Sequence, residues 1–196
     1  VNDTIDAAIE PINTSIATNA ANAAIQNSAT VAGGNEINTA NNAGTASINL
    51  LSPATITVPV GLAFSFNGTG YSGTQTVNVA PGNYSLATTS PQALATGARA
   101  VFASWSDAGA MSHVLTVGAA PLSVAGVFTT QYQLTTTAGS GGSVMPLSGQ
   151  FFDAGTVVNV TATPASGYFF TGWTGPVANA AQAATTVTMD APKTVA

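Results

Sequence analysis

From Ala46 onward, apolar and polar residues alternate in short runs, which is typical of β-strands that bury one face. The runs are bounded by Gly, Pro, Asn or Asp, the residues that turns favour. Short strands at this spacing predict an all-β fold, a meander that forms an antiparallel sandwich or a strongly curved sheet. The clearest runs cover residues 56–58, 63–66, 76–79, 84–87, 114–117, 122–128, 156–161, 168–170 and 185–189.

Two stretches of the chain share one pattern, which indicates a tandem repeat. Val-Phe-Ala-Ser-Trp at 101–105 corresponds to Phe-Phe-Thr-Gly-Trp at 169–173, and an Ala-Pro pair follows at 120 and at 191. The tryptophans lie 68 residues apart and the Ala-Pro pairs 71, so the copies are in register apart from a short insertion. This period predicts two tandem β-sandwich modules, module one over residues 51–129 and module two over residues 130–196.

The join between the modules and the end of module two carry further information. Thr129-Thr130 has no Gly/Ser spacer, which predicts a stiff connection. Module one continues past Ala125 through Phe128, whereas the equivalent strand of module two stops at Ala196. We therefore expect a shortened last strand, with a sheet edge that more chain or a neighbouring molecule would cover.

The aromatic residues have two interpretations. Phe64 and Phe66 share one face of their strand, and Trp105 and Trp173 are expected to fill the cores, where burial of each ring contributes about 2–3 kcal/mol. The alternative is an exposed platform on which sugar rings stack. Its other candidate residues are Tyr71, Tyr84, Tyr132, Phe151 and Tyr168.

Residues 1–50 form an Asn/Ala-rich segment without aromatic residues. Isoleucines at positions 5, 9, 12 and 16 follow helical spacing, and a helix over residues 12–25 could begin at Pro11. The Asn, Thr and Gly content of residues 27–44 favours loops and short strands instead. Both interpretations stay open, and in either case the segment is a candidate assembly arm.

Composition excludes several classes of partner. Only 5% of residues are charged, with two basic against seven acidic residues, so no basic surface is available for nucleic acid or anionic lipid. No apolar run is long enough to insert in a membrane. Cysteine is absent, so packing and strand pairing must hold the modules together.

The residues that could carry chemistry are few. His113 is the only histidine, and Ser112 and Asp107 lie near it, but a catalytic triad needs an oriented nucleophile in a pocket. The Gly-x-Gly-x-x-Gly spelling at 68–73 lies between strands with no helix after it, which indicates a hairpin turn rather than a phosphate site.

Three aspartates fall at turns, where an Asp side chain bonds nearby backbone: Asp107, Asp153 and Asp190. No paired carboxylates and no His/Cys cluster suggest acid–base chemistry or a metal site. We therefore expect no enzyme, and no catalytic, cofactor-binding or metal-binding residues.

Module two carries a family resemblance. Phe152-Asp153-Ala154-Gly155-Thr156, Gly167-Tyr168-Phe169-Phe170-Thr171-Gly172-Trp173 and Met189-Asp190-Ala191-Pro192 occur in order within residues 131–196, and this region resembles the divergent internalin B-type repeat of bacterial surface proteins. Residues 55–128 look like a looser relative that lacks the glycine before Trp105. The resemblance implies an exported, multi-module β-protein whose repeats act as stalks, spacers or adhesive surfaces, and it implies no catalytic residues.

These observations predict a secreted or cell-surface structural protein that forms a stalk, fibre or surface assembly. Self-association with neighbouring subunits, by exchange of a strand or helix, is the expected partnership. The alternative is an accessory or adhesin module of a larger secreted protein, which binds carbohydrate or a surface protein.

Overall fold

The computed structural model describes residues 24–30, 43–49 and 51–196, and it is all-β, with no helix in these ranges. No candidate membrane-spanning helix is found in this part of the chain. Near the N-terminus, β1 (Ala24–Thr30) pairs antiparallel with β2 (Ala43–Asn49). The helix considered for residues 12–25 lies outside the described residues, except for its last two positions, which belong to β1.

Module one consists of two sheets. The first has the strand order β6-β3-β11-β9-β8 and the second the order β10-β7-β4-β5. The first contains β3 (Ser52–Thr57), β6 (Thr74–Val79), β8 (Gln92–Ala95), β9 (Ala98–Trp105) and the start of β11 (Leu122–Thr136). The second contains β4 (Ala63–Phe66), β5 (Thr69–Ser72), β7 (Gly82–Thr88) and β10 (Ser112–Val117).

Module two repeats this plan with fewer strands. Its first sheet pairs the end of β11 with β13 (Gln150–Asp153) and β16 (Lys193–Val195). Its second sheet has the order β12 (Gly142–Met145), β14 (Val157–Pro164), β15 (Ala184–Thr188). Each module also contains one parallel pair between its first and last strands, in which Ile56 lies beside Val124 and Thr136 beside Val195.

Each module has its own hydrophobic core, because alternate residues of facing strands point inward. Phe64 and Phe66 are buried as predicted. Leu115 and Val117 of β10 belong to the core of module one, and Val187 and Met189 to the core of module two. The other fully buried members include Ile56, Leu62, Leu86 and Val124 in module one, and Leu134, Val160 and Val195 in module two.

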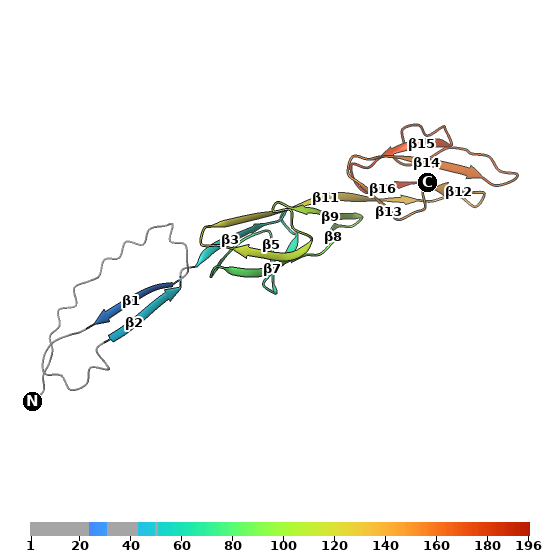
Figure 1. Ribbon diagram of the computed structural model, residues 1–196. Coiled ribbons are helices and arrows are strands. Elements are labelled where there is room, and N and C mark those ends of the chain that lie inside the picture. Colours follow the sequence, from blue (N-terminus) through green and yellow to red (C-terminus); the bar gives the residue numbers. More distant parts are fainter. Residues whose placement is uncertain (1–23, 31–42, 50) are drawn as a thin grey trace, which may run out of the picture.

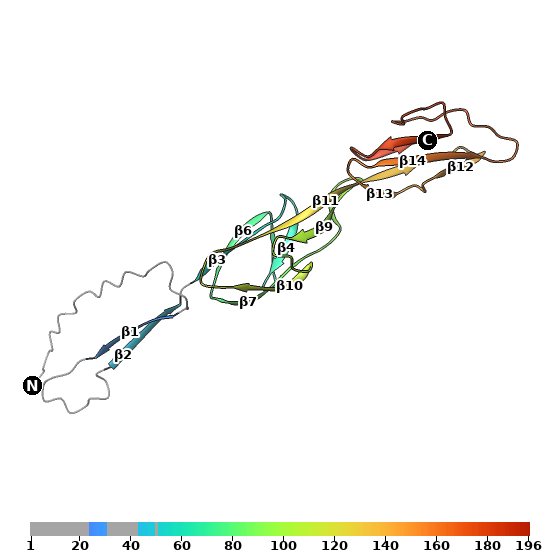
Figure 2. The same ribbon diagram turned by 45° about the horizontal axis from the view of Figure 1, so that its top comes forward.

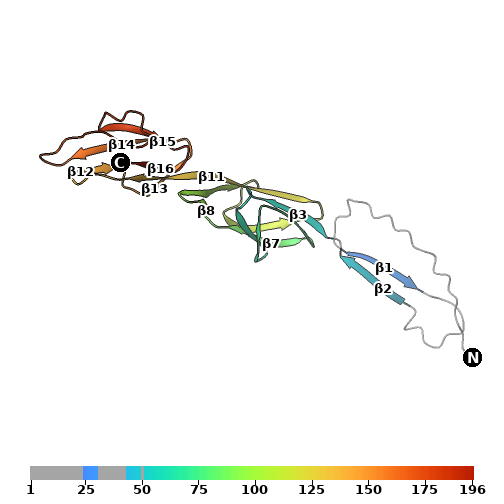
Figure 3. The same cartoon turned by 180° about the vertical axis from the view of Figure 1, so that it is seen from behind.

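Strand β11 runs through both modules without interruption (Figures 1 and 2). Residues 122–125 pair with β3, residues 126–132 with β9, residues 131–134 with β13 and residues 134–136 with β16. The position expected to join the modules, Thr129-Thr130, therefore lies inside one strand. In the views from front and back, the modules follow one another along an elongated molecule (Figure 3).

Two local predictions need correction. The turn expected across residues 68–73 is centred on Asn67 and Gly68, with φ of 49° and 78°, and residues 69–72 already return as β5. Positive φ at both central residues is typical of a two-residue hairpin turn, which Asn-Gly favours. The strand predicted at residues 168–170 is wrong, since this segment has no regular structure.

Candidate functional site

Both tryptophans lie in the cores, as expected. Trp105 is 2% exposed and donates its indole N–H to the carbonyl of Met111 at 3.3 Å. Trp173 is 6% exposed and donates in the same way to Gln182 at 2.8 Å. In each module the ring fills the core while its N–H binds the backbone of the following loop, so neither ring is free to stack on a sugar.

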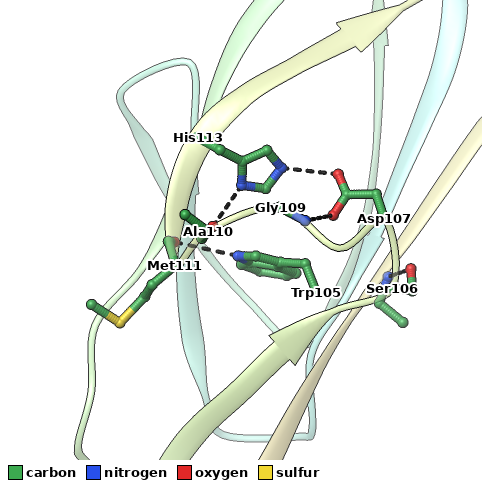
Figure 4. Close-up of polar contacts among 8 residues, drawn as sticks. Trp105, Ser106, Asp107, Gly109, Ala110, Met111 and His113 are labelled. Atoms are coloured by element: carbon green, nitrogen blue, oxygen red, sulfur yellow. Dashed lines mark hydrogen bonds and ion pairs between the residues drawn. The ribbon is translucent and has the colours of Figure 1, made fainter.

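After Trp105, the side chain of His113, the only histidine of the sequence, contacts the carboxylate of Asp107 (Figure 4). The His113 Nε2 atom lies 2.9 Å from Asp107 Oδ2, and its Nδ1 atom lies 2.7 Å from the carbonyl oxygen of Ala110. Both contacted atoms are acceptors, so both contacts are satisfied together only when each ring nitrogen carries a proton. The same Asp107 accepts the backbone N–H of Gly109 at 3.0 Å, which is the turn contact predicted for it.

Asp107 is held in its ionised form by these contacts. Burial disfavours the charged carboxylate, but the hydrogen bonds from Gly109 and His113 outweigh it, so the pKa of Asp107 lies below its ordinary value. With both ring nitrogens of His113 engaged, no nitrogen is left to activate a nucleophile such as Ser112. These hydrogen bonds hold together residues 107–113, the loop that follows Trp105.

The other predicted turn aspartates form side-chain contacts. Asp190 pairs with Lys193, and the hydrogen bond from Lys193 lowers the pKa of this exposed carboxyl. Asp153 accepts a hydrogen bond from the Gln131 side chain at 2.9 Å, rather than from the backbone of its own turn. No group of three or more His, Cys, Asp or Glu side chains that could hold a metal ion occurs in the described ranges.

The aromatic residues considered for a sugar platform are dispersed. Tyr71 stacks on Phe64 with ring centroids 5.5 Å apart, and Tyr84 stacks on Phe66 at 5.3 Å. Tyr132 packs against the core of module two. The remaining candidates are Phe151, which lies under Arg99, and Tyr168, whose side chain is 59% exposed.

A polar ladder crosses the join between the modules. On adjacent strands, Arg99 Nε donates to Gln131 at 2.8 Å, and Gln131 in turn donates to Asp153. The Arg99 guanidinium also lies 4.0 Å from the centre of the Phe151 ring, a cation–π contact. Strands β9, β11 and β13 supply these four residues, so the ladder ties module one to module two.

The turn between β8 and β9 adds a second inter-module contact. The Gln133 N–H donates to the Gly97 carbonyl at 2.8 Å. Gly97 has a φ of 72°, and a Cβ there would lie 3.0 Å from the Pro192 Cβ. Glycine therefore suits both the left-handed backbone and the close approach to module two.

A groove of about 320 Å³ opens on module two, and the sequence did not indicate it. It is lined by residues 137–144, 162–164, 168–173 and 196. Phe169, beside it, is 84% exposed, although most large apolar residues of this size are buried. The one available signal was the additional aromatic residue Phe169, whose counterpart in module one is Val101.

Comparison with protein families gives one match: residues 132–196 match the model described as a divergent InlB B-repeat domain. This confirms the resemblance inferred for module two, and repeats of this kind occur in bacterial surface proteins. No curated protein matches the chain, and no solved structure does.

Proposed function

We propose that this chain is part of a secreted or cell-surface structural protein, in which tandem β-modules form a stiff rod that serves a stalk, fibre or surface assembly. The observation that carries the proposal is the continuity of β11, which is a central strand of both modules. A shared strand cannot bend at the join without losing sheet hydrogen bonds on both sides.

The side-chain contacts at the join support the same role. The ladder from Arg99 through Gln131 to Asp153 and the hydrogen bond from Gln133 to Gly97 restrain rotation between the modules. The family match supports a place among bacterial surface proteins. The engaged ring nitrogens of His113 give no support to catalysis.

Small-angle X-ray scattering of the intact chain tests the stiffness of the join. We expect one narrow distribution of module-to-module distances for the natural chain. Inserting Gly-Gly-Ser between Thr129 and Thr130 breaks β11, so the distribution should broaden and its mean should fall. A broad distribution in the natural chain, equal to that of the insertion variant, would contradict the rod.

Self-association is the second part of the proposal, and electron microscopy of the purified chain tests it. Filaments or sheets are expected, and deletion of residues 1–25 should abolish them while the modules stay folded. Discrete monomers that are retained by an immobilised glycan would instead favour the accessory-module alternative. In that event Tyr168→Ala should weaken the retention, because Tyr168 is the exposed member of the candidate aromatic set.

A further inference from the structure

The two modules differ at one edge, beside their tryptophans. In module one, β9 lies between β8 and β11, and residues 98–105 pair antiparallel with residues 126–132. The rings of Phe102 and Trp105 lie 5.6 Å apart with an interplanar angle of 52°, and Phe128 of β11 meets Phe102 edge-on. Strand β11 thus covers the edge of β9 and adds an aromatic ring to its side-chain cluster.

In module two, residues 169–173 are the counterpart of residues 101–105. The rings of Phe170 and Trp173 lie 5.7 Å apart with an interplanar angle of 57°, nearly the geometry of Phe102 and Trp105. The backbone amides of residues 169–172 have no hydrogen-bond partner within residues 51–196. Residues 169–173 therefore place their aromatic side chains as β9 does, but no strand of the described chain pairs with their backbone.

The first backbone pair that would set the register of such a strand is already present in module two. In module one, the Ser106 N–H donates to the Ala125 carbonyl at 2.8 Å, just before β11 meets β9. The counterparts in module two are Thr174 and Ala196, which exchange two backbone hydrogen bonds of 2.8 and 3.1 Å. A strand that extends this pair would lie along residues 169–173, on the wall of the 320 Å³ groove.

We propose that residues 168–173 are a strand-acceptor edge, which takes the connecting strand of a further repeat module in the antiparallel register that β11 holds on β9. This inference rests on the proposed structural role and names the joint by which modules are added. The occupant is an extended segment with the side-chain pattern of residues 126–131. This segment would continue β16 beyond Ala196, and its backbone would pair with the alternate amides of residues 169–172 that face it.

The acceptor specifies the chemistry of the first residues of that strand. Opposite Trp105 stands Gly126, where a Cβ would lie 2.9 Å from the Trp105 ring and 3.1 Å from Val58. A glycine is therefore required opposite Trp173, which is buried in the same way. An aromatic residue two positions later would meet Phe170, as Phe128 meets Phe102.

The test appends a second copy of residues 126–131, Gly-Val-Phe-Thr-Thr-Gln, after Ala196 of the full chain. Amide hydrogen exchange should slow by at least about tenfold at those residues of 169–172 whose N–H groups face the appended strand, because an antiparallel strand on one edge pairs with alternate residues. In the matched control the glycine of the appended copy is replaced by valine, and the slowing should be lost. Unchanged exchange with the glycine copy, or equal slowing with both copies, would overturn the proposal.

A free peptide with the sequence of residues 126–131, added to the natural chain, shows how much covalent attachment after Ala196 contributes to binding. Binding should be weaker than for the appended copy, with saturation only near millimolar peptide, since attachment supplies a comparable effective concentration. Slowing by an unrelated peptide of equal length would also count against the proposed pattern. A negative result would count against the acceptor edge alone. The stiffness of the two-module rod depends on the β11 join, and scattering tests it independently.

Discussion

Module one and module two build the same two-sheet plan around a buried tryptophan, but they complete it differently. In module one the segment before Trp105 is a strand with a neighbour on each side, whereas the segment before Trp173 has no strand neighbour in the described part of the chain. The Phe–Trp cluster forms in both modules. The core therefore positions this segment, and strand pairing only determines whether it is regular.

The largest expected effect on this comparison comes from the tryptophans themselves. Trp105→Ala and Trp173→Ala should each lower the free energy of unfolding of their module by about 3–5 kcal/mol, because each leaves a large cavity. Urea unfolding followed by NMR, which resolves the two modules, measures both. Tyr168→Ala is the matched control and should cost less than about 0.5 kcal/mol, since that ring is exposed. Equal losses at all three sites would mean that the tryptophans are not core residues.

The next effect concerns the glycine that faces Trp105. Gly126→Val should destabilise module one by about 1–3 kcal/mol, because a side chain there overlaps the Trp105 ring and Val58. Thermal unfolding of the variant checks this value. Gly118→Val serves as control, since a Cβ at Gly118 meets nothing within 4 Å. A control that loses as much stability as Gly126→Val would show that glycine flexibility, not packing, is responsible.

A smaller effect is expected at the join, which neither module contains alone. Arg99→Ala removes the hydrogen bond to Gln131 and the contact with Phe151, at a cost of about 1 kcal/mol. Residual dipolar couplings should then report greater motion between the modules, while each module stays folded. Arg99→Lys keeps the charge but loses the planar donor, so it should rescue the variant only in part. Full rescue by Arg99→Lys would mean that the positive charge, and not the planar guanidinium group, stabilises the join.

The smallest effect is the pH dependence of the contact between Asp107 and His113, which is present only in module one because His113 is the only histidine. Because the folded-state pKa of Asp107 is lowered, its stabilising contribution is present above the ordinary value of 3.8 and is lost as the pH falls through the folded pKa. The contribution is at most about 1 kcal/mol, discounted for solvent screening. Asp107→Asn should remove it from the acid unfolding curve of module one. Asp190→Asn, which changes an exposed pair in module two, should leave that curve unchanged.

The sequence alone determined the all-β class, the repeat and the buried tryptophans. Period-two alternation and the repeated Phe–Trp spacing are local signals, which depend on backbone sterics and side-chain burial, and a linear pattern records both. The burial of Phe64 and Phe66, predicted from this periodicity, and that of Trp105 and Trp173, predicted from the large apolar area of their rings, is confirmed.

The tertiary structure decided the rest, because these features depend on residues far apart in the chain. Residues 168–170 were predicted as a strand from their own composition, but a strand needs a partner, and the partner that β9 has comes from β11. The parallel pairs, the ladder from Arg99 to Asp153 and the groove beside Phe169 join segments separated along the sequence. A pattern of neighbouring residues predicted the stiff join at Thr129-Thr130 and the shortened last strand, but it carries no record of which strands pair. Only the folded sheets show that β11 serves both modules and that residues 169–172 lack a strand neighbour within residues 51–196.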